Sequence, residues 1–345
     1  MKLLKLLFIL LILPAVCFSQ EKQTAEEEPV LPGTVITLTT SDEWEINAVY
    51  VAPNIAEENS YPYFESYYEN LAIEKEKLAV LEDDEDTIEI DLQTEVSTKK
   101  YPIILLVHDY QKDNTSWINF SKKIRRLGFG YLAIDLRGHG KSIKYEEPKE
   151  DEDEEISEDK ERKVIDYKSF ARTGVDNEYN QMVRDVQAGV DYLLEKGYTE
   201  QDIIFLGEGL GSNILLKSLV FYKDILMTAV LSPTLKNKGV LTAQSLRLYK
   251  NPVLIAVSME EKKGFIDASI LRNIAYISSG EGKVTFLSTY QYFGTEMLDT
   301  YFSKTLAQWL KYPILPPVQK VVEIEEPVVL LEQQNLETEQ GVLYE

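Results

Sequence analysis

A short turn at residues 207–211 has the spacing of a catalytic nucleophile's turn but lacks the nucleophile. The sequence around it reads Ile203-Ile-Phe-Leu-Gly-Glu-Gly-Leu-Gly-Ser212, an apolar strand followed by the turn and a helical segment. A Gly-x-Ser-x-Gly turn between a strand and a helix raises a serine hydroxyl above the sheet, where it can attack a carbonyl carbon. Here Gly209 stands at the central position. Since glycine has no side chain, the sequence predicts a retained turn without its reactive group.

The segments around this turn alternate between strand and helix patterns. A continuous apolar run, typical of a strand buried on both faces, occurs at 102–107. Further strands are expected at 131–134, 203–206, 229–231, 253–257 and 284–287. Two alternating runs predict a hairpin within 34–53. Helices are expected at 115–127 (capped by Thr115 or Ser116), at 177–196, after residue 211 and at 297–310. This order predicts an α/β fold with a mostly parallel central sheet and helices on both faces.

Three further segments share the order and spacing of one enzyme family. The segment Tyr101-Pro-Ile-Ile-Leu-Leu-Val-His-Asp109 is similar to a third strand with its oxyanion turn. Tyr131-Leu-Ala-Ile-Asp-Leu-Arg-Gly-His-Gly-Lys-Ser142 is similar to an Asp-x-Arg-Gly-His-Gly-x-Ser loop, and Tyr292-Phe-Gly-Thr-Glu-Met-Leu298 to a histidine loop. With the 207–211 turn, these segments make residues 34–312 resemble the α/β-hydrolase superfamily, specifically its dienelactone-hydrolase and serine-aminopeptidase-like branches.

The resemblance implies three catalytic positions, of which two have lost their catalytic side chains. In this family a serine attacks, a histidine takes its proton and an acid orients the imidazole. By position, the serine corresponds to Gly209 and the histidine to Phe293. The acid corresponds to Glu261 or its neighbour Glu260. No residue of this chain is therefore assigned a catalytic role.

The histidine count supports this interpretation without any alignment. The chain has two histidines, His108 and His139, and both precede Gly209. The family order of serine, acid and histidine requires a histidine after the turn. A shifted alignment therefore cannot supply the missing base.

The resemblance also implies an altered oxyanion hole. Its backbone donors come from the residue after the nucleophile, here Leu210, and from the loop after the third strand. Asp109 replaces the small glycine that is usual in that loop. A carboxylate at this place would repel a developing oxyanion and oppose the stabilisation that the hole provides.

Other chemistry-bearing residues have simpler structural explanations. Ser212 is either a displaced nucleophile or a residue that satisfies free amides at the helix start, and the second is favoured. His108, at the end of a buried strand, is either a general base or a hydrogen-bonded structural residue, and His139 lies in a loop that is structural in the family. Neither histidine has the spacing to a second histidine that would support a metal site with Asp109 or Asp135.

Two ligand motifs are also approximated but incomplete. The 207–212 segment resembles a dinucleotide fingerprint, yet it ends in Ser212 and follows a late strand. Gly138-His-Gly-Lys-Ser142 lacks the first glycine of a phosphate loop, because Asp135 stands there. The acidic run at 82–86 lacks the glycine turn of a calcium loop and is better explained as a solvated loop. No cofactor and no metal is expected.

The first 20 residues indicate an exported protein. Residues 1–20 have the charged start and short apolar run of a signal peptide, with cleavage after Ser19 or Cys17. Cys17, the only cysteine, lies in a loose lipoprotein-like box, so lipid attachment there is the alternative. The net charge of −22 argues against nucleic acid and anionic lipid as partners. A small molecule or a protein remains as the partner class.

The expected organisation is a signal peptide (1–20), an acidic linker (21–33), the hydrolase-like domain (34–312) and a Pro- and Glu-rich tail (313–345). Acidic insertions interrupt the domain near 54–100 and 146–161. The sequence as a whole predicts an exported pseudohydrolase, periplasmic or extracellular, with a binding or structural role. The alternative is an active ester or peptide hydrolase with non-standard catalytic residues.

Overall fold

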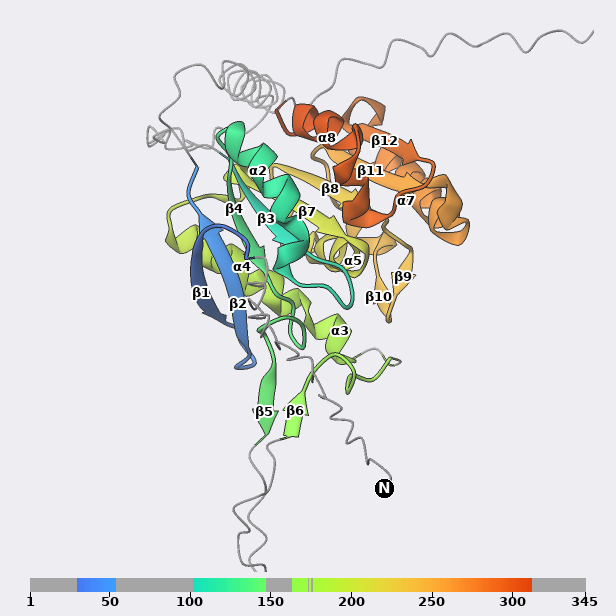
Figure 1. Cartoon of the computed structure of the whole chain (residues 1–345). Coiled ribbons are helices and arrows are strands. Elements are labelled where there is room, and N and C mark those ends of the chain that lie inside the picture. The colour runs from blue at the N-terminus through green and yellow to red at the C-terminus, as the bar shows by residue number, and fades with distance from the viewer. Residues whose placement is uncertain (1–29, 54–101, 147–162, 173, 175, 312–345) are drawn as a thin grey trace, which may run out of the picture.

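One sheet organises the part of the chain that the structure, a computed structural model, describes: residues 30–53, 102–146, 163–172, 174 and 176–311. Eight strands follow the order β1-β2-β4-β3-β7-β8-β11-β12 (Figure 1). The strands are β1 (Thr34–Thr39), β2 (Glu45–Val51), β3 (Ile103–Val107), β4 (Gly130–Ile134), β7 (Ile203–Glu208), β8 (Met227–Leu231), β11 (Val253–Ser258) and β12 (Val284–Thr289). Both the expected strands and the expected hairpin of β1 and β2 are present.

The sheet is mostly parallel, as the sequence predicts. The six strands from β4 to β12 run parallel, and the β1–β2 hairpin joins them antiparallel through β2. The chain passes from β3 to β4 on one side and then crosses to β7 on the other side of β3. Such a change of direction is a topological switch point, the usual ligand position in an open α/β sheet. Asp109 follows β3 and Gly209 follows β7, so both residues lie at this point.

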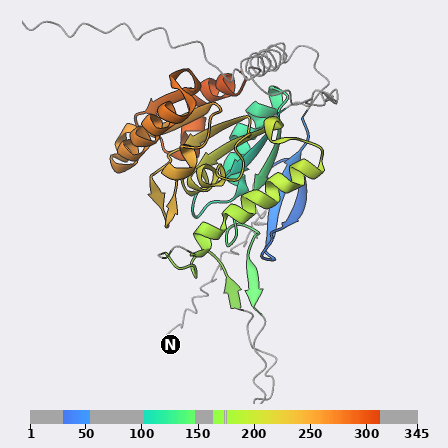
Figure 2. The ribbon, with the colours of Figure 1, turned by 180° about the vertical axis from the view of Figure 1, so that it is seen from behind.

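Helices cover both faces of the sheet (Figures 1 and 2). Successive side chains of a strand point to opposite faces, so Leu105 of β3 joins one buried cluster and Leu106 joins the other. The first cluster contains residues of α4, α5 and α7, and the second contains residues of α2 and α8. The α-helices are α2 (Ile118–Arg126), α3 (Glu178–Gln181), α4 (Val183–Glu195), α5 (Gly209–Ser218), α6 (Ala243–Leu246), α7 (Lys263–Ser279) and α8 (Phe302–Lys311).

Three helix boundaries differ from the sequence-based expectation. The first helix is preceded by the 3-10 turn η1 (Asn114–Trp117), which Asp113, rather than Thr115 or Ser116, caps by accepting a 2.9 Å hydrogen bond from the Thr115 amide. The helix expected at 177–196 is broken at Met182 into α3 and α4. The last helix starts later than expected, because residues 294–299 form the 3-10 turn η5.

Two short ribbons, which the sequence did not indicate, extend from the sheet. The strands β5 (Lys144–Glu146) and β6 (Lys163–Ile165) project from the domain and lead into residues 147–162 (Figure 1). The strands β9 (Lys236–Asn237) and β10 (Val240–Leu241) form a hairpin beside α5. The remaining 3-10 turns are η2 (Glu200–Asp202), η3 (Met259–Glu261) and η4 (Glu281–Lys283).

Several expectations concern residues outside the described part of the chain. They are the signal peptide with Cys17, the insertion at 54–100, the 82–86 run, nearly all of the insertion at 146–161 and the tail. Leu31, three residues before the expected domain start, is 1% exposed and belongs to a buried cluster. No helix in the described residues has the length and apolar character needed to cross a membrane.

Candidate functional site

The turn after β7 keeps the backbone of a nucleophile turn. Glu208 ends the strand in extended conformation, and α5 begins at Gly209, whose φ is +49°. This left-handed conformation costs a residue with a side chain about 1–2 kcal/mol. Gly211 is required for a different reason: a Cβ there would overlap the carbonyl oxygens of Val107 and His108. The two glycines let α5 start directly against the end of β3.

The Asp109 carboxylate occupies the position that the sequence predicts for an oxyanion. Its Oδ1 accepts a 2.6 Å hydrogen bond from the Leu210 amide and a 2.7 Å hydrogen bond from the Tyr110 amide. One donor follows the predicted nucleophile position, and the other comes from the loop after β3. Asp109 was expected to repel an oxyanion from a neighbouring place, but its own oxygen binds the two amides directly. Two charge-assisted hydrogen bonds of this length are strong interactions.

The same carboxylate explains why residue 209 is a glycine. A Cβ on Gly209 would overlap the carboxylate carbon and both carboxylate oxygens of Asp109. The space that a serine side chain needs is therefore filled by Asp109. The two residues are 100 positions apart in the sequence, and their identities depend on each other through this contact.

Glu208, next to the turn, connects it to the loop after β12. The carboxylate is 1% exposed. Its Oε1 lies 2.5 Å from the Lys112 ammonium and accepts a 2.7 Å hydrogen bond from the Thr295 amide. Burial raises the pKa of Glu208, and the Lys112 ammonium opposes that rise. Oε2 is buried with no hydrogen-bond partner in the described part of the chain, so Lys112 is the charge that compensates this carboxylate.

The predicted acid position is engaged in a structural contact. Glu261 Oε1 accepts a 2.6 Å hydrogen bond from the Ser232 hydroxyl and a 3.1 Å hydrogen bond from the Ser258 amide. The Ser232 hydroxyl in turn accepts a 3.0 Å hydrogen bond from the Gly294 amide. Ser232 thus links the predicted acid to the loop that carries Phe293, where a histidine would normally make that link.

We call the group of contacts around Asp109, Glu208 and Gly209 the centre. Phe293 does not fill it. A phenylalanine ring at the histidine position has the size to occupy the space of an imidazole and would then turn the site into apolar core. The side chain is instead 41% exposed. The next residue, Gly294, is the one that faces the centre, because a Cβ there would overlap the Glu208 carboxylate. The loop of Phe293 therefore contacts Glu208 directly and Glu261 through Ser232, while the phenylalanine ring is partly exposed to solvent.

Ser212 and His108 both have their polar atoms occupied. The Ser212 hydroxyl donates to the Leu231 carbonyl at 2.9 Å and accepts from the Leu231 amide at 3.1 Å, so it joins α5 to β8. The expectation that Ser212 caps the helix start is wrong. His108 Nε2 accepts a 2.9 Å hydrogen bond from the Leu136 amide, and Nδ1 lies 2.7 Å from the Asp109 carbonyl oxygen. Burial lowers the pKa of His108 to about 4.

Comparisons with known proteins agree with the observed fold. The family model described as serine aminopeptidase, S33, matches residues 98–264. Among solved structures, the esterase Pf2001 of Pyrococcus furiosus is 12% identical, with a TM-score of 0.51 and coverage of 83% of this chain and 92% of that chain. The described part of the chain has the α/β-hydrolase fold.

Two further solved structures are similar at a lower score. Est1E from Butyrivibrio proteoclasticus, solved with ferulic acid, is 12% identical, with a TM-score of 0.49 and coverage of 80% of this chain and 96% of that chain. Dienelactone hydrolase from Anabaena variabilis is 9% identical, with a TM-score of 0.46 and coverage of 81% and 95%. No curated protein matches the sequence. The shared property is the fold.

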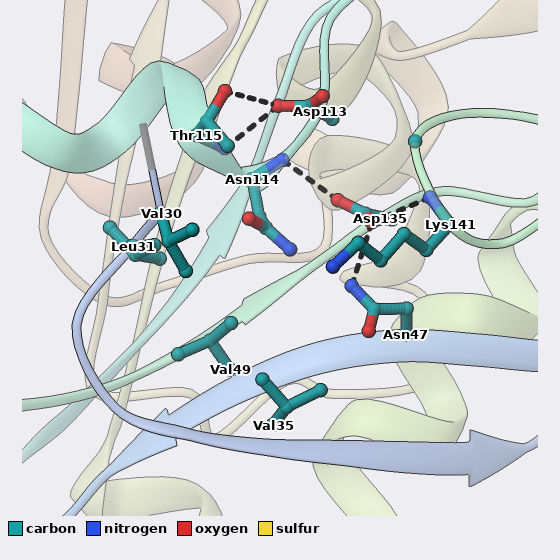
Figure 3. A pocket seen from close by; sticks show the side chains of 11 residues that line it. Val30, Leu31, Val35, Asn47, Val49, Asp113, Asn114, Thr115, Asp135 and Lys141 are labelled. Carbon is teal, nitrogen blue, oxygen red and sulfur yellow. Dashed lines mark hydrogen bonds between the residues drawn. The ribbon is translucent and has the colours of Figure 1, made fainter. Parts of the chain in front are cut away.

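The loop at 135–142, the longest hydrolase-like motif of the chain, holds the domain together. The Asp135 carboxylate accepts hydrogen bonds from the amides of Asn114 (2.8 Å) and Lys141 (3.0 Å) and from Asn47 Nδ2 (2.8 Å), beside a pocket of about 210 Å³ (Figure 3). The Ser142 hydroxyl donates to the Asp135 carbonyl at 2.8 Å. The motif therefore ties β2 and η1 to the end of β4.

Arg137 of the same α/β-hydrolase motif forms a buried ion-pair network. Its guanidinium donates to Asp185 Oδ1 at 2.7 Å and to Asp42 Oδ2 at 2.6 Å. Asp185 is fully buried, and burial raises its pKa to about 6 although Arg137 lowers it. Burial also acts to raise the pKa of Asp42, but hydrogen bonds from Arg137 and Thr40 outweigh it and hold that pKa well below its usual range. The network fastens α4 to the β1–β2 hairpin.

Aromatic rings fix the Tyr110 end of the centre. The Tyr110 ring packs edge-on against Tyr167, with centroids 5.2 Å apart, and against His139 at 5.9 Å. The Lys238 ammonium, from the β9–β10 hairpin, lies 3.9 Å from the Tyr110 ring centroid. His139 stacks on Tyr167, and burial lowers its pKa to about 4. This packing holds the Tyr110 amide where Asp109 needs it.

The sequence did not predict the roles of three residues that contact Glu208 or Glu261, namely Lys112, Ser232 and Thr295. Glu208 carried a usable signal, since a carboxylate at the end of a fully apolar strand requires a buried partner. The identity of that partner depends on loop geometry that the sequence does not display. In the described residues, no group of three or more His, Cys, Asp and Glu side chains is arranged to hold a metal ion.

Proposed function

We propose that this α/β-hydrolase-fold protein is a pseudohydrolase that retains the fold without the reaction and has a binding or structural role. The observation that carries the proposal is the Asp109 carboxylate, which accepts hydrogen bonds from the Leu210 and Tyr110 amides. An oxyanion hole works because its donors are free to bind the charge that develops on the substrate. With a negative oxygen already bound to both amides, a substrate carbonyl would find repulsion in place of stabilisation.

The rest of the centre supports the same proposal. Gly209 offers no nucleophile, and the exposed Phe293 offers no base. Glu261 is hydrogen-bonded to Ser232, which replaces the missing histidine as the link to the loop after β12. Serine, base and oxyanion hole are thus all replaced, while the contacts that hold the same elements together are kept.

The rival function is an active ester or peptide hydrolase that uses other residues. Ser212 is the nearest alternative serine, but it is fully buried and its hydroxyl both donates to and accepts from Leu231. His108 is the nearest alternative base, but its Nε2 accepts from the Leu136 amide. A nucleophile and base must be within hydrogen-bond reach of each other and of the substrate, so these contacts weigh against the rival.

An activity assay separates the two functions. Purified protein is expected to hydrolyse p-nitrophenyl acetate and butyrate at the buffer rate and to remain unlabelled by a fluorophosphonate probe, whereas an enzyme typically accelerates its reaction by at least about a million-fold. An active esterase run in parallel establishes that the assay works. Turnover above buffer that disappears in Ser212→Ala or His108→Ala would overturn the pseudohydrolase proposal and identify the relocated residue.

Export is a second part of the proposal, and it is supported by the charged, apolar and polar order of residues 1–20. Mass spectrometry of the protein purified from its own cells is expected to give an N-terminus at Gln20, after cleavage following Ser19. A mature chain that begins at a lipid-modified Cys17 would establish the lipoprotein alternative. Retention of Met1 and the apolar run would contradict export.

A further inference from the structure

A pocket of about 630 Å³ lies at the far end of α5 from the filled centre. Its volume falls within the range of small-molecule sites. It is formed by the C-terminal end of α5, the β9–β10 hairpin, α6 and the segment before α3. Its lining includes Lys217, Phe221, Lys236 and Leu241.

The walls of this pocket are apolar and open to solvent. Four hydrophobic side chains from three different segments line it, and each is at least 39% exposed: Val220, Phe221, Leu241 and Leu248. Scattered exposed hydrophobic residues are common on protein surfaces, but a contiguous group around a hollow marks a binding site. The apolar walls favour a ligand with a hydrocarbon or aromatic part.

The charge of the pocket is opposite to that of the molecule. The chain has 58 acidic and 36 basic residues, yet the lining contains Arg172, Lys217 and Lys236 and no carboxylate. None of these three cations forms an ion pair with a described residue. The pocket is therefore a positive, apolar hollow on an acidic protein.

Lys217 is the cation best placed to bind a ligand. Its ammonium donates a 2.6 Å hydrogen bond to Asn180 Oδ1, an arrangement that orients it without neutralising it. Partial burial lowers the pKa of Lys217, and Asp176, which does not line the pocket, opposes this shift. An ammonium has three donors, so two remain for an anionic group in the pocket.

The pocket is separate from the degenerate centre. Lys217 is eight residues beyond Gly209 on the same helix, which corresponds to about 12 Å along the helix axis. Neither Asp109, Gly209 nor Phe293 lines the pocket. Binding here therefore does not depend on whether the hydrolase reaction is lost.

We propose that this pocket binds an amphipathic carboxylate, an organic anion with an apolar chain or ring. The carboxylate lies against Lys217 and Lys236, and the apolar part lies against Phe221, Leu241 and Leu248. A purely acidic peptide would leave the apolar walls unused, and an uncharged apolar molecule would leave the cations unused. The cations and the apolar walls together favour a molecule that has both a carboxylate and an apolar part.

Calorimetric titration of the purified protein with decanoate tests this proposal. Decanoate is expected to bind saturably at one site, and decyltrimethylammonium, with the same chain and the opposite charge, is expected not to bind. The Lys217→Gln/Lys236→Gln variant is expected to weaken decanoate binding by about 10-fold or more, since hydrogen bonds to charged groups are the strong ones. Leu241→Asp is expected to abolish it, because a carboxylate then lies in the apolar wall.

A matched surface variant controls for general charge effects. Lys223 is exposed near the end of α5 but does not line the pocket, so Lys223→Gln is expected to bind decanoate as the unmodified protein does. Thermal unfolding of each variant establishes that it is folded. The proposal is overturned if folded protein shows no saturable decanoate binding, if the cationic amphiphile or a Glu-rich peptide binds as tightly, or if the double lysine variant binds unchanged.

Discussion

Replacing Gly209 with serine, the residue that would restore a nucleophile, is expected to destabilise the protein by about 3–5 kcal/mol. The serine Cβ would overlap the Asp109 carboxylate, which must then turn away and give up its hydrogen bonds to Leu210 and Tyr110. Charge-assisted hydrogen bonds contribute about 1.5–3 kcal/mol each. Because the displaced carboxylate regains hydrogen bonds to water, we expect the net loss from both bonds to be about 2–3 kcal/mol. The left-handed backbone of residue 209 adds about 1–2 kcal/mol. The variant is also expected to remain without esterase activity, because no histidine follows residue 209.

A double-mutant cycle with Asp109→Ala measures the contact between the two residues. In the Asp109→Ala background, Gly209→Ser is expected to cost only the backbone strain, about 1–2 kcal/mol. The two substitutions should therefore show a coupling free energy of about 2–3 kcal/mol in urea unfolding, which is within the range for residues in contact. Additive costs, or an unchanged urea midpoint for Gly209→Ser, would contradict the placement of the Asp109 carboxylate.

The replacement of Arg137 by methionine is expected to cost about 3–5 kcal/mol in free energy of unfolding at pH 7. Asp185 is fully buried and depends on the Arg137 guanidinium for its charge compensation. Removing one partner of a buried pair leaves an uncompensated charge, which is far more costly than the pair is stabilising. The pKa of Asp185, already raised by burial to about 6, should rise further, so that the folded variant takes up a proton at Asp185.

Arg184 supplies the matched control for this experiment. Its guanidinium lies 2.9 Å from Asp42, the same acid that Arg137 binds, but its side chain is 41% exposed. Exposed ion pairs contribute about 0–1 kcal/mol, so Arg184→Met should unfold at nearly the urea concentration of the unmodified protein. Equal effects of the two substitutions would refute the buried network. Recovery of stability in Arg137→Met/Asp185→Leu would establish that the cost lies in the unpaired carboxylate.

The sheet could be predicted from the sequence because its strands are buried on both faces. An apolar run such as 103–107 is typical of a strand that is covered by protein on both faces, and all five of its residues are fully buried. Helix boundaries were less predictable. No glycine or proline marks the interruption at Met182. Asp113 caps η1, although Thr115 and Ser116 nearby could also cap a helix. The β5–β6 and β9–β10 ribbons are two or three residues long, too short for an alternating pattern to be recognised.

The absence of a serine at position 209 and of a late histidine could be read from the sequence. The contacts that Asp109, Glu208 and Ser232 make could not. The spacing of 207–211 locates Gly209, and the two early histidines exclude a late base. The direction of the Asp109 side chain could not be predicted, because it is decided by open space at a residue 100 positions away. For the same reason, the Glu208–Lys112 pair and the Ser232 bridge required the folded loops to be known.

The contact between Asp109 and residue 209 also has a consequence for the proposed loss of catalysis. A return to catalysis requires a serine at 209, a small residue at 109 and a histidine on the loop of Phe293. The first step taken alone creates the overlap, and the second taken alone leaves the Leu210 and Tyr110 amides without their acceptor. Each single substitution lowers stability before any activity could be selected. Under the proposed pseudohydrolase function, the Asp109 carboxylate on the Leu210 and Tyr110 amides therefore acts as an evolutionary ratchet, because it makes each single step back to an enzyme destabilising.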